Sequence, residues 1–216
     1  MSSFRVEWER GEVGVRLVGS GTPILLAHGA GTNHDHPMIT GLASALAGEG
    51  LAAVTFNYPY TEAGRRATDR MPVLMECHRS VAGWARTELG ELVFAGRSMG
   101  GRVASMLAAE GEPMRGLVLY SYPLHPSGKP DRLRAEHLPA IEVPMLFFQG
   151  GRDALARSEL FDRHVRPLTG ATVVDLEGLD HSWRGGGHTY ADVVPGVASA
   201  TAAWIRHLAS GGVSQA

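Results

Sequence analysis

The stretch Gly96-Arg-Ser98-Met-Gly100 places a single serine between two glycines. An apolar run, Glu91–Ala95, precedes it, and a run rich in small residues, Val103–Ala109, follows it. This pattern predicts a sharp turn from a strand into a helix, with Ser98 held in a strained backbone conformation at the helix N-terminus. A Cβ two residues before or after the serine would collide with the neighbouring strand or helix, so glycine is expected at both positions. Ser98 is therefore a candidate nucleophile.

Short apolar runs and helix-like segments alternate along the rest of the chain, and continuous apolar runs of this length suit strands buried on both faces. The expected strands are Ile24–Ala27, Leu51–Phe56, Glu91–Ala95, Gly116–Tyr120, Pro144–Phe148 and Ala171–Asp175, with an antiparallel edge hairpin over Arg5–Val18. The expected helices are His36–Glu49, Met71–Leu89, Ser98–Glu110, Arg157–Arg166 and Ala191–Leu208. The predicted fold is α/β, with a mostly parallel sheet of about seven strands flanked by helices. We expect a single domain over residues 1–216, with a frayed tail at 210–216.

The composition excludes several classes of protein. A formal net charge of −2 gives no electrostatic reason to expect nucleic acid or an anionic membrane as a partner. The single cysteine, Cys77, cannot form an internal disulfide and is expected in the core. The first ten residues include Glu7 and Glu9 and do not resemble a signal peptide. We therefore expect a cytoplasmic protein with no membrane partner.

A serine hydroxyl becomes nucleophilic when a base takes its proton, and a histidine base needs a carboxylate to fix its tautomer. Asp153 follows the expected strand at Pro144–Phe148, and His181 follows the last strand and its turn. Because functional groups gather at the carboxyl ends of parallel strands, we expect Ser98, Asp153 and His181 to meet there. These are the predicted catalytic residues.

Other residues compete for these roles. Asp153 could instead cap the helical segment after it, while Asp131 and Glu142 lie in or beside a loop and Asp180 is adjacent to His181. Asp153 is retained as the acid, because no other carboxylate lies at a late strand end in the right order. His188 follows a glycine run, which would hold a base poorly, so His181 is preferred.

The segment Thr32-Asn-His-Asp-His36 raises the possibility of a metal site. No further motif completes a ligand set at familiar spacing, so we expect a polar loop that caps a helix before Pro37, and no metal or cofactor. This loop should bring the Ala30 amide beside that of Met99 to form an oxyanion hole. Four further residues are candidates for contact with substrate: His34, His36, Arg97 and Tyr58.

Five motifs together resemble those of the α/β-hydrolases, over about Ile24 to Leu208. They are His28–Gly31, Phe56–Tyr60, Gly96–Arg102, Gln149–Asp153 and Asp180–Ser182. The chain is similar to the small dienelactone-hydrolase-like members, and more narrowly to the branch containing a testis-expressed hydrolase-like protein and a histone-acetyltransferase-complex subunit. Dienelactone hydrolases proper use a cysteine nucleophile where this chain has Ser98.

The resulting expectation is a serine hydrolase, a carboxylesterase that forms an acyl-enzyme on Ser98 and acts on a small-molecule ester. The segment Ser121–Val143 is short and contains Pro123, Pro126, Pro130 and Pro139, which leaves no room for a large cap domain. An open site should prefer small or exposed acyl groups. The alternatives are a thioesterase or peptidase with the same three residues, and a non-catalytic interaction scaffold.

Overall fold

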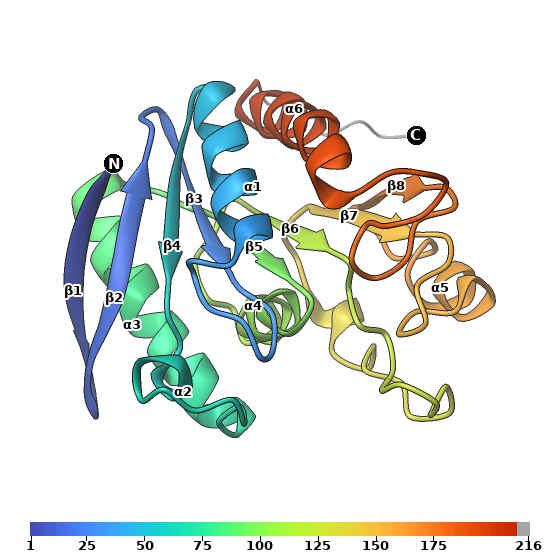
Figure 1. Ribbon diagram of the computed structural model, residues 1–216, viewed down its shortest axis with the longest axis horizontal. Coiled ribbons are helices and arrows are strands. Elements are labelled where there is room, and N and C mark those ends of the chain that lie inside the picture. The colour runs from blue at the N-terminus through green and yellow to red at the C-terminus, as the bar shows by residue number, and fades with distance from the viewer. Residues whose placement is uncertain (211–216) are drawn as a thin grey trace.

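The computed structural model describes residues 1–210, in which eight strands form one sheet in the order β1-β2-β4-β3-β5-β6-β7-β8 (Figure 1). The pairs β1–β2 and β2–β4 are antiparallel, and all other pairs are parallel. The strands are β1 (Ser2–Trp8), β2 (Gly11–Val18), β3 (Thr22–Ala27), β4 (Leu51–Phe56), β5 (Val93–Arg97), β6 (Gly116–Tyr120), β7 (Met145–Gly150) and β8 (Ala171–Leu176).

Helices cover both faces of this sheet. Helices α1 (Pro37–Gly48) and α6 (Tyr190–Ala209) pack side by side on one face (Figure 1). The other face carries α3 (Met71–Leu89), α4 (Met99–Ala109) and α5 (Ser158–His164). Two short elements complete the described chain: α2 (Pro59–Glu62) and a 3₁₀ turn at Leu138–Ala140.

The inner strands alternate between two apolar cores because successive side chains of a strand point to opposite faces. In β5, Phe94 lies in the core under α3 and α4, whereas Val93 and Ala95 lie in the core under α1 and α6. In β7, Phe147 and Phe148 divide in the same way. Burial on both faces explains why these strands are continuous apolar runs in the sequence.

The α/β prediction and the mostly parallel sheet are confirmed, with one strand more than the expected seven or so. The edge hairpin forms over β1 and β2 as predicted, and α3 has the predicted bounds. Strand β8 differs from the expectation of full burial, because it lies at the open edge of the sheet and is half-buried. The predicted tail lies outside the described residues apart from Ser210.

This topology gathers loops at one edge of the sheet. The carboxyl ends of β3, β4, β5, β6, β7 and β8 all lie at that edge, since these strands are parallel. The connection from β6 to β7, residues 121–143, contains only the short 3₁₀ turn as regular structure and forms no cap domain. A functional site is therefore expected at this edge of the sheet.

Candidate active site

Ser98 occupies the tight turn between β5 and α4. Its φ angle of 51° lies in the left-handed region that non-glycine residues rarely adopt, and its side chain is 8% exposed. A Cβ at Gly100 would lie 2.6 Å from the carbonyl oxygens of both Ala27 and His28, and a Cβ at Gly96 would clash with the backbone of Gly100 and Gly101. Both glycines are therefore required sterically, as the sequence predicted.

Ser98, His181 and Asp153 form one continuous chain of hydrogen bonds. The Nε2 atom of His181 lies 2.9 Å from the Ser98 hydroxyl, and its Nδ1 atom lies 2.8 Å from Oδ2 of Asp153. With the proton on Nδ1, Asp153 accepts it and leaves Nε2 free to accept from the hydroxyl. This arrangement can transfer a proton from serine to histidine while the carboxylate stabilises the resulting cation.

The side chain of Asp153 is fully buried, and both of its carboxylate oxygens have partners. Besides His181, Oδ2 accepts a hydrogen bond from the side-chain amide of Gln149 at 2.8 Å, and Oδ1 accepts one from the Leu155 amide at 2.8 Å. The alternative role as a helix cap does not hold, because α5 begins later, at Ser158. Sequence reasoning gave Gln149 no role, although its place at the end of β7 was a usable signal.

The loop after β8 presents His181 to the other two residues. Oδ1 of Asp180 accepts hydrogen bonds from the amides of Ser182 and Arg184 at 2.8 and 2.9 Å, so Asp180 is a turn residue as predicted. Trp183 is fully buried with a φ of 57°. The rival base, His188, is exposed, and its backbone pairs with Gly185 instead.

Two backbone amides, those of Met99 and Ala30, are predicted from the sequence to hold an oxyanion. Met99 is the first residue of α4, so its amide has no intrahelical acceptor. Within residues 1–210, neither the Met99 nor the Ala30 amide has a hydrogen-bond acceptor. Ala30 is exposed in the loop that follows β3. Both amides therefore remain candidates for oxyanion binding.

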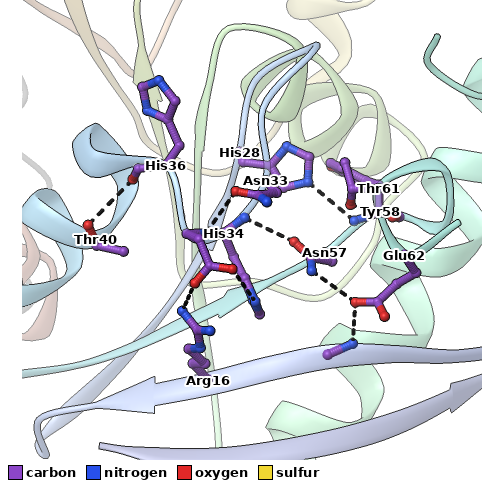
Figure 2. Close-up of polar contacts among 12 residues, drawn as sticks. Arg16, His28, Asn33, His34, His36, Thr40, Asn57, Tyr58, Thr61 and Glu62 are labelled. Carbon is purple, nitrogen blue, oxygen red and sulfur yellow. Dashed lines mark hydrogen bonds and ion pairs between the residues drawn. The ribbon is translucent and has the colours of Figure 1, made fainter. Parts of the chain in front are cut away.

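The loop after β3 is anchored to the end of β4 at two points. Nδ1 of the buried His28 lies 2.8 Å from the Gly29 carbonyl oxygen, while its Nε2 accepts from the Tyr58 amide at 3.2 Å. Burial lowers the pKa of His28 to about 4, which keeps the ring neutral for these bonds. Further along the loop, Asn57 accepts from the His34 amide and donates to Glu62, each at 2.9 Å (Figure 2).

His34 and Asp35 lie close together, whereas His36 does not join them. Nε2 of His34 lies 3.7 Å from Oδ2 of Asp35, whose carboxylate also pairs with Arg16, and the ring of His36 points away from the Asn57–Glu62 bond (Figure 2). His36 instead accepts a hydrogen bond from the Met38 amide at 3.3 Å and caps α1, as the sequence predicted. No group of three or more potential metal-ligating side chains occurs in the part of the chain that the structure describes.

The expectation that Tyr58 contacts substrate is wrong. Its side chain is fully buried, its ring packs edge-on against Phe56, and its hydroxyl lies 3.1 Å from Nδ1 of His78 in α3. His34 is also almost fully buried, and it lies beside Gly14 of β2. Neither ring lines the pocket beside the site.

Arg97 and His36 do line a pocket of about 320 Å³, together with Thr32, Pro37, Met38, Ser182, Arg184 and Tyr190. Arg97 donates from Nη2 to the backbone carbonyl of His181 at 3.2 Å. A Cβ at Gly29 would lie 2.8 Å from Nη1 of Arg97, so a glycine makes room for the guanidinium. Two lining residues, Arg97 and Ser182, are the chain neighbours of Ser98 and His181.

Comparisons with known proteins agree with the fold described above. A family model described as an alpha/beta hydrolase domain matches residues 20–206. A helix long and apolar enough to cross a bilayer is not found among the described residues.

Several solved structures resemble this fold. An alpha-beta serine hydrolase homologue from Coxiella burnetii is 18% identical, covers 93% of this chain and 96% of its own, and has a TM-score of 0.74. An a/b serine hydrolase without lid from Xanthomonas campestris is 20% identical, with 94% coverage of each chain and a TM-score of 0.73. A dienelactone hydrolase from Anabaena variabilis is 21% identical, covers 95% of this chain and 96% of its own, and has a TM-score of 0.75.

Proposed function

The chain belongs to the alpha/beta hydrolase domain family, and from this premise we propose that it is a serine esterase that hydrolyses small carboxylic esters. The observation that carries the proposal is the unbroken hydrogen-bond chain from Ser98 through His181 to the buried Asp153. A strained serine backbone supports the same conclusion, because strain of this kind persists where the surrounding structure enforces it. An interaction scaffold would have no use for either feature.

The proposed reaction has two halves. Ser98 attacks the ester carbonyl as His181 takes its proton, and the Met99 and Ala30 amides hold the oxyanion. His181 then gives that proton to the departing alcohol, which leaves an acyl group on Ser98. In the second half, a water molecule loses a proton to His181 and attacks the acyl-enzyme, releasing the acid and restoring the serine. Ser98, His181 and the two amides all belong to the chain itself.

Small or exposed acyl groups are the preferred substrates in this proposal. The short connection at residues 121–143 builds no cap domain to enclose a long chain, and the structural relative from Xanthomonas campestris is described as lacking a lid. A narrower kinship with the branch that contains the testis-expressed hydrolase-like protein is part of the proposal and rests on the sequence motifs. Faster turnover of long-chain than of short-chain nitrophenyl esters would contradict the acyl preference.

The first experiment is covalent labelling with a fluorophosphonate, followed by intact mass measurement of wild type and Ser98→Ala. We expect one adduct on the wild type and none on the variant, since only an activated serine reacts. A panel of oxygen esters, thioesters and amides then separates an esterase from a thioesterase or peptidase. Absence of an adduct on folded wild-type protein would overturn the proposal in favour of a scaffold.

A further inference from the structure

A histidine without a role in the proposed reaction, His125, lies in the connection between β6 and β7, and its side chain is buried. Both ring nitrogens have partners. Nδ1 lies 2.9 Å from the carbonyl oxygen of Pro126, and Nε2 accepts a hydrogen bond from the Arg157 amide at 3.2 Å. A backbone amide can only donate, so Nε2 is the acceptor and the ring proton lies on Nδ1. The ring thus joins two segments that are 32 positions apart in the chain.

The contacts of His125 reach the loop that carries the catalytic acid. The Leu155 amide donates to Oδ1 of Asp153 at 2.8 Å, and the Leu155 carbonyl accepts from the backbone amide of His125 at 3.0 Å. The Arg157 amide, two residues further on, donates to the His125 ring. His125 therefore contacts this loop at the residue that bonds the Asp153 carboxylate, and again two residues later.

Hydrogen bonds to this loop from other parts of the protein come from His125 alone. Within residues 1–210, every other hydrogen bond of residues 154–157 goes to a partner in the segment 153–161. Ala156 packs in the apolar core, but apolar contacts are not directional. The direction of the peptide groups that bond Asp153 therefore depends on His125.

The same arrangement occurs in the loop after β3. Nδ1 of His28 lies 2.8 Å from the carbonyl oxygen of the next residue, Gly29, and Nε2 accepts from the Tyr58 amide at 3.2 Å (Figure 2). His28 joins the loop after β3 to the end of β4, just as His125 joins the loop after β6 to the loop after β7. In both places a buried imidazole fixes a loop that follows a parallel strand.

Contact with substrate or metal does not account for His125. Its ring nitrogens are both occupied, and it does not line the pocket of about 320 Å³. It also belongs to no group of three or more potential metal-ligating side chains among residues 1–210. The contacts with residues 155 and 157 are what the buried ring and its amide provide.

We propose that His125 is a positioning residue for the catalytic acid, because its ring fixes the loop at residues 153–157 so that the Asp153 carboxylate holds Nδ1 of His181. The inference rests on the proposed esterase function and adds a residue to its machinery. Catalytic groups must be held within about 0.5 Å of their productive positions. A loosened loop should therefore slow the chemical step and leave substrate binding unchanged.

Two amide substitutions separate the two contacts of the ring. In His125→Gln the side-chain oxygen reaches as far as Nε2 does and can accept from the Arg157 amide. In His125→Asn the amide reaches only as far as Nδ1, so it can donate to the Pro126 carbonyl but does not meet Arg157. We expect His125→Asn to lower kcat about tenfold with KM unchanged, and His125→Gln to keep kcat within about threefold of the wild type. Equal kcat in the two variants would overturn the inference.

A double-mutant cycle shows whether His125 acts through Asp153. In the Asp153→Asn background, His125→Asn should cause no further fall in kcat, because the carboxylate that the loop positions is already absent. A second tenfold fall would make His125 a general support of the fold and contradict the inference.

The matched control is His137→Asn, which changes another histidine of the same connection. Its ring bonds the Ser105 hydroxyl in α4 and not the loop at residues 153–157. This variant should lower the free energy of unfolding and leave kcat unchanged. An equal loss of kcat in His137→Asn and His125→Asn would assign the effect to loosening of the whole connection and overturn the inference.

A spectroscopic readout separates failure of this inference from failure of the esterase proposal. Ester turnover and the fluorophosphonate adduct of the wild type test the esterase alone. The proton between Nδ1 of His181 and Asp153 gives a downfield NMR resonance that needs no turnover. Wild type and His125→Gln should show this resonance, and His125→Asn should lose it. The same spectrum in all three proteins would overturn the inference, whether or not the esterase proposal holds.

Discussion

Oδ2 of Asp153 and Nδ1 of His181 lie 2.8 Å apart, although the two residues are 28 positions apart in the chain and follow different strands. The same oxygen also accepts from Gln149, so the carboxylate is held from two sides. Orientation of the imidazole therefore depends on a group that does not itself contact the serine.

Asp153→Asn should lower kcat by about 10⁴-fold, because an amide at this position can hold His181 in the wrong tautomer. KM should change little, since Asp153 is buried and does not line the pocket. Steady-state kinetics on a neutral nitrophenyl ester measures both. The control is Asp180→Asn, which keeps an oxygen acceptor for the Ser182 and Arg184 amides. A comparable loss of kcat in Asp180→Asn would contradict the assignment of Asp153 as the catalytic acid.

Gln149→Leu should lower kcat about tenfold, less than Asp153→Asn, because it removes one hydrogen bond to a charged oxygen and leaves the His181 contact in place. Gln149→Glu should be worse, since a second buried carboxylate would lie beside Asp153 and both cannot stay ionised. The ratio of kcat values between the two variants checks this order. Equal kcat in wild type and Gln149→Leu would show that Asp153 needs no support from this side.

Asn57→Leu should weaken the loop that carries Ala30, because Asn57 joins the His34 amide to Glu62. We expect a loss of about 2 kcal/mol in the free energy of unfolding and about a tenfold fall in kcat. Denaturant unfolding and ester kinetics measure the two effects. Arg5→Gln, which removes the outer partner of Glu62 together with exposed contacts to Glu12, is the control. A loss of stability with unchanged kcat would make Asn57 structural only.

Local chemistry explains why so much of this site was predictable. A Cβ at Gly96 or Gly100 would clash with backbone atoms, so the spacing of the two glycines predicts the turn that carries the serine. Buried parallel strands are continuous apolar runs, which gives the strand ends and hence the positions of Asp153 and His181. The same apolar runs place Ser98, Asp153 and His181 after three separate strands of the predicted sheet.

Side-chain direction was the part that sequence could not supply. Tyr58 follows a strand at the correct edge, yet its ring turns into the core toward His78. Gln149 donates to Asp153 across the turn that follows β7, and the conformation of that turn was not readable from the apolar run before it. The pocket joins Arg97, Arg184 and Tyr190 from three separate elements or loops, so its lining cannot be derived from any one motif.

Gly100→Ala should destabilise the fold by about 3 kcal/mol, because the added Cβ would press on the carbonyl oxygens of Ala27 and His28. Gly83→Ala in α3 is the matched control, since a Cβ there meets nothing within 4 Å. That control should stabilise the protein by about 0.7 kcal/mol through helix propensity. Denaturant unfolding of both variants checks the prediction, and a loss in Gly83→Ala equal to that in Gly100→Ala would contradict it.

Acid should destabilise the protein through three histidines that fold in their neutral form. Burial lowers the pKa of His28 to about 4 and, with Arg79 nearby, that of His78 to about 3. Burial and the charge of Arg102 lower the pKa of His137 to about 4. Between these values and the ordinary pKa of about 6.5, the unfolded chain binds more protons than the folded one. Stability is therefore complete above about pH 6.5 and falls as the pH drops toward 4.

Urea unfolding between pH 7 and pH 5 measures this loss, which should reach about 1.4 kcal/mol per pH unit for each histidine within its range. His137→Gln tests one contribution, because glutamine can still donate to the Ser105 hydroxyl, which lies 2.7 Å from Nε2 of His137. The slope of stability against pH should fall by less than a third, because His137 is less buried than His28 and His78. His207→Gln, at an exposed position of α6, is the control. An unchanged slope in His137→Gln would show that His137 is protonated in the folded protein or plays no part in its acid sensitivity.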